Sequence, residues 1–174
     1  MTSARRQRKS RAIRAGLAHG VACLGLVAAL GAGAPCAAWA GPMTTERVVT
    51  DPLTGLAVGG IDPVGYFTDA APIAGRPEHE LPYAGVIWRF RNQGNLAAFK
   101  ANPDVYMPRY GGYDPIAIGR SVAVAGNPRL WALAGDHLYL FHSEEARRRF
   151  LADPDEAIRR ADGAWPAVLD SLVP

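Results

Sequence analysis

Cysteine is scarce in this sequence. Only Cys23 and Cys36 among its 174 residues are cysteines, so residues 41–174 contain none. This absence excludes a disulfide scaffold, a cysteine nucleophile and a thiolate metal site from that part of the chain.

Catalytic signature motifs are also missing. The sequence has no Gly-x-Ser-x-Gly elbow, no phosphate-binding glycine loop, no dinucleotide fingerprint and no His-Glu-x-x-His helix. The His142-Ser143 pair suggests an activated hydroxyl, but neighbouring residues rarely reach hydrogen-bonding geometry. Ser143 is better explained as a helix N-cap. We therefore expect a non-catalytic protein.

Acidic residues are absent from the first 40 positions, which contain the three parts of an export signal. A basic segment comes first, followed by the weakly hydrophobic stretch Ala15–Gly33 and a small-x-small cleavage site at Ala38-Trp39-Ala40. We expect residues 1–40 to be a signal peptide that is cleaved near Ala40. The product would be a periplasmic or secreted protein that meets the membrane only through its leader.

Three alternatives remain open for this segment. The apolar stretch approaches the length of an uncleaved membrane anchor, although its Gly and Ala content and the cleavage site favour removal. Arg5-Arg6 suggests the twin-arginine export route, but no apolar pair follows at the expected place. Cys36 suggests a lipoprotein, yet Pro35 before it fits a lipobox poorly.

The basic character of the whole chain comes from this leader. The chain has 19 basic and 16 acidic residues, a net charge of +3. The leader removes six basic and no acidic residues, so the remainder carries 13 minus 16, or −3. The charge therefore gives no support for nucleic-acid binding. The remaining chain, 174 minus 40 or 134 residues, is long enough for one domain with an ordinary core.

The segment 130–160 predicts a strand–turn–strand–helix unit. Leu130–Ala134 and His137–Phe141 are short runs of β-forming residues separated by Gly135-Asp136, a pattern typical of a tight hairpin. Ser143 then stands at the N-cap position of a helix, which Pro154 ends or restarts.

The same unit occurs 51 residues upstream. Its hairpin combines Glu78–Tyr83 and Val86–Arg91 around Ala84-Gly85, and Asn92 is its candidate helix cap. Five residues recur in register: Phe90 with Phe141, Phe99 with Phe150, Ala101 with Ala152, and Pro103-Asp104 with Pro154-Asp155. We predict a single small α+β domain of two ββα-like halves, with short antiparallel strands and helices packed on one face.

The segments outside the two units receive simpler predictions. Residues 41–59 form a lead-in segment that packs as an edge strand or hairpin around Asp51-Pro52. Asp62-Pro63 and Asp114-Pro115 each begin a short helix, the second reaching Ile118. The last predictions are a strand at Ser121–Ala125, a final helix at Asp155–Arg160 and a C-terminal tail at residues 167–174.

A series of short motifs extends over both halves. In chain order they are Gly60-Ile61-Asp62-Pro63-Val64-Gly65-Tyr66-Phe67, Trp88-Arg89-Phe90, Phe99 with Asn102-Pro103, Tyr110-Gly111-Gly112-Tyr113, Leu138-Tyr139-Leu140 with His142-Ser143, and Ala161-Asp162-Gly163-Ala164-Trp165-Pro166. In this order and spacing the chain resembles a YHS domain-containing protein, one of the small exported bacterial members of that family. The resemblance covers about Gly59 to Trp165, and we expect a YHS-like domain at residues 60–166.

The resemblance implies a binding module linked to copper or zinc, because the family is related to modules that hold metal through cysteines. In this chain Tyr113 is followed by Asp114-Pro115, where family members often carry a cysteine. The candidate ligands are His142, His137, Asp114 and Met107. Imidazole and carboxylate suit a divalent metal, and thioether suits Cu(I). They form no ligand pair at a diagnostic spacing, and His137 and His142 would face opposite sides of one extended strand.

A second hypothesis is a metal-free domain that retains the YHS scaffold and binds a protein or a small ligand. If Tyr110 and Tyr113 are exposed, they would line its pocket or interface. We favour core packing for these two tyrosines over such a binding role.

Overall fold

The structure is a computed structural model that describes residues 47–172. These residues belong to one compact unit, Ala40–Pro174. The expected signal peptide, its cleavage site and the first part of the lead-in segment lie outside the described residues. Within residues 47–172, no helix is both long enough and apolar enough to cross a membrane.

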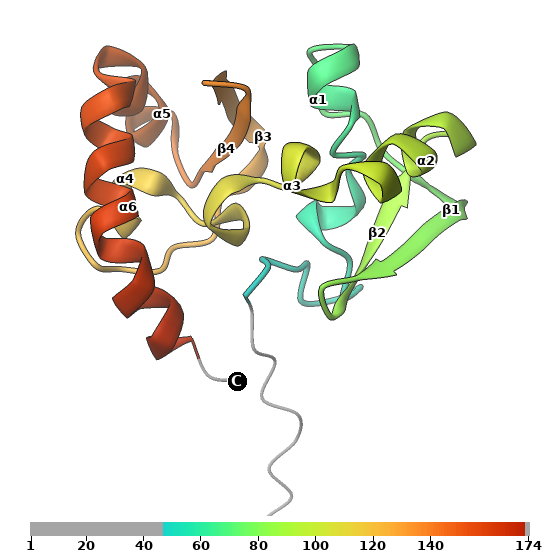
Figure 1. Cartoon of the computed structure of the whole chain (residues 1–174), viewed down its shortest axis with the longest axis horizontal. Helices are drawn as coiled ribbons and strands as arrows, with labels where there is room; N and C mark the ends of the chain where they lie inside the picture. The colour runs from blue at the N-terminus through green and yellow to red at the C-terminus, as the bar shows by residue number, and fades with distance from the viewer. Residues whose placement is uncertain (1–46, 173–174) are drawn as a thin grey trace, which may run out of the picture. The chain divides into compact units, whose positions relative to one another are not determined.

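The two predicted halves are present and repeat the same element order (Figure 1). The first half contains β1 (Arg76–Tyr83), β2 (Val86–Phe90), α2 (Gln93–Ala101) and α3 (Pro103–Tyr106). The second contains β3 (Asn127–Ala134), β4 (His137–Phe141), α5 (Glu144–Ala152) and α6 (Pro154–Ser171). All of these bounds except the end of α6 are related by an offset of 51 residues, as from Arg76 to Asn127. Each hairpin is its own two-stranded antiparallel sheet, which confirms the predicted α+β class.

Both hairpins close through two consecutive residues with positive φ. The turn residues are Ala84-Gly85, at φ 52° and 80°, and Gly135-Asp136, at φ 53° and 60°. Two left-handed residues in succession match the right-handed twist of the flanking strands, which is why two-residue hairpins prefer this turn. The helices then begin as predicted. Asn92 Oδ1 accepts the Asn95 N–H at 2.8 Å, and Ser143 Oγ accepts the Ala146 N–H at 3.2 Å.

Each half is preceded by one turn of 3-10 helix and one short α-helix. These are η1 (Val58–Gly60) with α1 (Gly65–Thr68), and η2 (Arg109–Gly112) with α4 (Pro115–Ile118). The helix that was predicted after Asp114-Pro115 ends at Ile118, as expected. A glycine after each short helix permits a close backbone crossing: a Cβ on Gly75 would lie 2.5 Å from Arg89, and a Cβ on Gly126 would lie 2.6 Å from Leu140.

The core consists of two aromatic clusters with matching geometry. Phe99 packs at 5.1 Å from Phe90, and Phe150 packs at 5.1 Å from Phe141, with interplanar angles of 55° and 56°. The halves also contact each other. Tyr66 from the first half packs on Trp131 at 5.3 Å, and Leu138 and Leu140 of β4 belong to the first half's cluster. The two halves therefore bury faces against each other and form the single domain that was predicted.

The predicted end of the last helix, the predicted tail and one predicted strand were wrong. The last helix, α6, runs through Ser171 instead of ending at Arg160, and it includes most of the predicted tail. Its buried residues Ala157, Ala161 and Val168 lie on one face at helical spacing, so packing carries the helix past Pro166. Ser121–Ala125 is not a strand; only Ala125 forms an isolated bridge, with Tyr113.

The lead-in segment forms a small hairpin-like turn, as predicted. Thr50 and Ala57 make one antiparallel bridge. Asp51 Oδ1 between them accepts the backbone N–H groups of Leu53 at 3.1 Å and Thr54 at 2.9 Å. Asp and Asn favour such turns because their side chains can replace a backbone acceptor.

Candidate functional site

Two buried aspartates occupy equivalent places in the two halves. Asp62 and Asp114 both have no exposed surface. Oδ1 of Asp62 accepts the Val64 N–H at 2.9 Å, and Oδ1 of Asp114 accepts the Ile116 N–H at 2.8 Å. Asp114 thus caps α4, whereas Asp62 accepts in the turn that leads to α1, which begins at Gly65 without a side-chain cap. Both carboxylates satisfy backbone donors that would otherwise be left unpaired.

The second oxygen of each aspartate holds the end of the neighbouring hairpin. Oδ2 of Asp62 accepts the backbone N–H of Arg91 at 2.9 Å, and Oδ2 of Asp114 accepts that of His142, also at 2.9 Å. Because 91 plus 51 is 142, these two donors are equivalent as well.

The halves differ in the side chain that contacts Oδ2 of each aspartate. In the first half the Asn95 amide donates to Asp62 Oδ2 at 2.6 Å. The residue equivalent to Asn95 is Ala146, which has no polar group to donate. The His142 ring takes that place instead, with Nδ1 at 2.5 Å from Asp114 Oδ2. The first half therefore has a buried amide next to its aspartate, whereas the second half has an imidazole that reaches the surface.

This contact fixes the orientation of His142. A carboxylate can only accept, so the geometry assigns a proton to Nδ1, which donates it to Asp114. The Nε2 atom is left to contact other groups. The His142 side chain is 38% exposed whereas that of Asp114 is fully buried, so the pair joins the interior to the surface.

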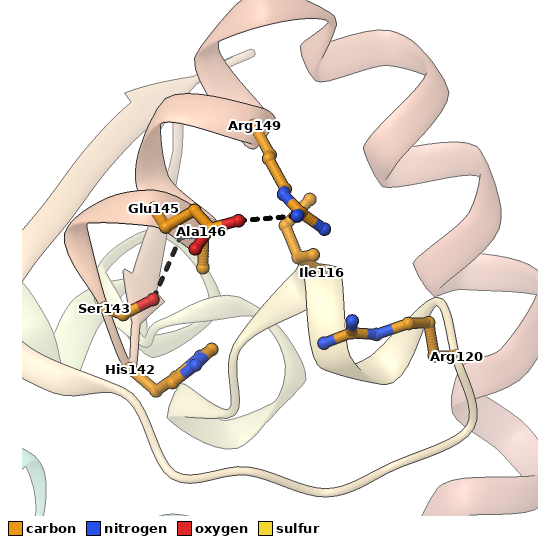
Figure 2. A pocket seen from close by; sticks show the side chains of 7 residues that line it. All are labelled: Ile116, Arg120, His142, Ser143, Glu145, Ala146 and Arg149. Atoms are coloured by element: carbon orange, nitrogen blue, oxygen red, sulfur yellow. Dashed lines mark hydrogen bonds and ion pairs between the residues drawn. The ribbon is translucent and has the colours of Figure 1, made fainter.

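His142 lines a pocket of about 150 Å³ at the start of α5. The other lining residues are Ile116, Arg120, Ser143, Glu145, Ala146 and Arg149. Figure 2 shows the His142 ring and the Arg120 guanidinium turned toward each other from opposite sides, with Arg149 above.

A second pocket, of about 210 Å³, adjoins the first between α4 and α6. The two share Ile116, Arg120 and Arg149. The residues that only the second pocket has are Pro115, Gly119, Ala157 and Arg160, so apolar groups form most of its added wall. We call the two pockets together the α4 groove.

The charges of the α4 groove are unequal. Arg149 lies 2.5 Å from Glu145 and Arg160 lies 2.5 Å from Glu156, so both of these cations are paired. No carboxylate within residues 47–172 forms an ion pair with Arg120. The lining therefore has three guanidinium groups and one carboxylate, and Arg120 is the cation available to a ligand.

The predicted metal ligands are only partly brought together. Asp114 and His142 meet, but Asp114 uses both oxygens for the contacts above. Met107 packs as a partly buried apolar residue against the first half's cluster. His137 begins β4, at the opposite end from His142. Within the described residues, no three His, Cys, Asp or Glu side chains are grouped so that they could hold a metal ion.

Tyr110 and Tyr113 are buried, with 4% and 5% of their surfaces exposed. Core packing is therefore confirmed for both tyrosines. Their binding role stays a prediction, and Tyr110 also lines a pocket together with Met107 and Trp165. Both rings lie against Trp165 of α6, and the Tyr110 hydroxyl donates to Asp162 at 2.9 Å. Burial, followed by the hydrogen bond to Asp162, raises the pKa of Tyr110 above its ordinary value.

The sequence pattern did not indicate Arg120, Ile116, Arg149 or Ala146 as site residues. One signal for the site was available. Arg91 and Asn95 in the first half correspond to His142 and Ala146 in the second, and these two differences face the same buried carboxylate. A departure from an internal repeat indicates a position where one copy has a separate role.

Comparison of the chain with protein-family models, with curated proteins and with solved structures found no match in any of the three.

Proposed function

We propose that this protein is an exported, non-catalytic binding module with a YHS-like scaffold, and that it binds a small ligand in the α4 groove without a metal. The observation that carries the proposal is the opening at Ala146. The first half fills the equivalent place with Asn95, whereas the second half leaves His142 facing a pocket.

The chemistry of the groove supports binding over catalysis. The only hydroxyl in the first pocket is that of Ser143, whose oxygen accepts the Ala146 N–H as a helix cap. The only carboxylate, Glu145, is paired with Arg149. Fixed polar groups beside an apolar wall are typical of ligand sites.

A variant designed to fill the opening at residue 146 tests this proposal. Ala146→Asn places in the second half the amide that the first half already accommodates next to its buried aspartate. We expect compounds that raise the thermal midpoint of the wild-type protein to lose that effect in Ala146→Asn. Ala97→Asn, at an exposed position of α2 and away from the groove, serves as the control. A panel of anionic, neutral and cationic small molecules that shifts neither protein would overturn the proposal.

A metal-linked role remains a second candidate, and one observation favours it. A histidine whose Nδ1 donates to a carboxylate is the usual arrangement behind a metal-bound Nε2. His142 with Asp114 has this arrangement, although the described residues supply no further ligand. Metal content after purification, and thermal shifts with copper and zinc, distinguish the two candidates. A shift that His142→Ala abolishes would support the metal; metal-free protein that shows no shift would remove it.

A further inference from the structure

We infer that the ligand of the α4 groove is a small organic anion, with a carboxylate or phosphate head held by the Arg120 guanidinium and the Ser143 hydroxyl beside His142, and a short apolar body lying between α4 and α6. This inference rests on the proposed function and adds the chemical class of the ligand.

The head position follows from the cations. Arg120 presents a guanidinium group that no carboxylate of residues 47–172 neutralises, and it turns toward His142 in the same pocket (Figure 2). Guanidinium binds carboxylate and phosphate oxygens through two parallel N–H groups. Ser143 lines the same pocket and adds a hydroxyl that can donate while its oxygen caps α5.

The single carboxylate of the lining, that of Glu145, does not prevent an anion from binding. Glu145 lies 2.5 Å from Arg149, so its charge is already compensated. A cationic ligand in the first pocket would lie beside Arg120 and Arg149 with only that one compensated carboxylate. The lining therefore favours an anion over a cation.

The apolar body follows from the adjoining pocket. Pro115, Ile116, Gly119 and Ala157 contribute carbon surface there, and this pocket shares Ile116, Arg120 and Arg149 with the one that holds the head. The adjoining pocket, of about 210 Å³, has room for several methylene groups. A ligand that fills both parts would gain hydrophobic free energy in addition to its ion pair.

The test is isothermal titration of the purified protein with inorganic phosphate and with straight-chain carboxylates from acetate to hexanoate. We expect the carboxylates to bind more tightly as they lengthen, by about fourfold for each buried methylene. The corresponding alcohols and amines should not bind. Binding of phosphate alone, with no gain from chain length, would identify a phosphate head without the apolar body and would overturn that part.

Two arginine variants test whether Arg120 binds the anionic head of the ligand. Arg120→Gln should weaken carboxylate binding by roughly tenfold or more, because a charge-assisted contact is lost. Arg148→Gln, on the exposed side of α5 and outside the groove, should leave the affinity unchanged. Equal effects of the two would overturn the role of Arg120.

The outcomes separate this inference from the proposed function. If a neutral or cationic compound binds and Ala146→Asn abolishes its binding, the groove is a ligand site and the anion assignment is wrong. If no compound of any charge binds, both are wrong.

Discussion

At the scale of single residues, the two buried aspartates connect segments that are far apart in the chain. Asp62 and Asp114 each join the start of a short helix to the end of a hairpin, and each is fully buried. A buried acceptor of this kind stabilises the fold chiefly because its loss leaves several donors without a partner.

Replacing Asp114 with asparagine tests this role. The new amide nitrogen would face the His142 N–H, so two donors would oppose each other. We expect the free energy of unfolding to fall by about 1–3 kcal/mol in Asp114→Asn, measured by urea denaturation. Asp62→Asn is the matched variant and should show a loss of the same size. A loss in neither variant would contradict the role of both carboxylates as buried acceptors.

Three tyrosines should resist ionisation. Burial raises the pKa of Tyr66, of Tyr110 and of Tyr139 above the ordinary value. The unfolded chain releases these protons near pH 10 while the folded protein keeps them, so the free energy of unfolding should fall as the pH rises beyond about 10. Below that pH the tyrosines contribute no pH dependence. The near-ultraviolet absorbance of tyrosinate, compared with and without urea, measures the effect; identical titrations would contradict it.

At the scale of elements, the two hairpin turns have the same geometry but different residues. Ala84 adopts φ 52° in the first turn, and the second turn uses Gly135 at that place with φ 53°. An alanine in the left-handed region costs about 1–2 kcal/mol, whereas glycine and asparagine adopt it readily. The first turn therefore holds a strain that the second avoids.

Ala84→Asn should relieve this strain. We expect the free energy of unfolding to rise by about 1 kcal/mol, because Asn-Gly is the preferred sequence of such a turn. Ala84→Val should lower it, since a β-branched residue is disfavoured at positive φ. Chemical denaturation of both variants measures the difference, and a stabilising effect of valine would refute the turn assignment.

Pro166 is a second residue that lowers the stability of the fold locally, because it lies inside α6. Proline has no N–H to donate and is unfavourable in a helix interior by about 3 kcal/mol. We expect Pro166→Ala to raise the free energy of unfolding by about 1–3 kcal/mol. Ala167→Gly, one residue along, should lower it by about 1 kcal/mol and thus show that this part of α6 unfolds with the domain. Helix content from circular dichroism should change in the same directions.

At the scale of the whole molecule, the halves are joined by contacts that neither could make alone. The Tyr66 hydroxyl donates to the Pro128 carbonyl at 2.7 Å, and Leu138 of the second hairpin lies in the first half's cluster. We therefore expect a single unfolding transition. Small single domains with a shared core usually unfold in this way.

The matched phenylalanines test this cooperativity. Phe99→Ala and Phe150→Ala each remove a fully buried ring and should each lower the free energy of unfolding by about 3–5 kcal/mol. Tryptophan fluorescence and far-ultraviolet circular dichroism should report the same midpoint in both variants. Two separate midpoints in either variant would show that the halves unfold independently.

Local chemistry explains why much of the fold could be predicted. The Ala84-Gly85 and Gly135-Asp136 turns, the Asn92 and Ser143 caps, and the helix after Asp114-Pro115 all depend on residues near one another in the chain. The end of α6 could not be predicted in this way, because Pro166 indicates a stop. Packing of Ala161 and Val168 against the core overrides that signal.

The candidate site depended on contacts over longer separations. Asp114 and His142 were each noted from the sequence, but as candidate metal ligands. Their hydrogen bond spans 28 residues, and the pocket beside it requires Arg120 from the α4 region as well as α5. A linear pattern contains no measure of such distances.

The sequence by itself determined the repeated ββα order, the thiol-free character of residues 41–174, the two hairpin turns and the helix caps Asn92 and Ser143, because these follow from residue type and short-range backbone geometry. Only the tertiary structure decided that Tyr110 and Tyr113 belong to the core, that Asp114 orients His142, and that an alanine in place of the first half's asparagine opens a groove. The physical reason is that burial and pocket shape arise when distant segments pack together, and equivalent positions in two halves acquire different surroundings once they do.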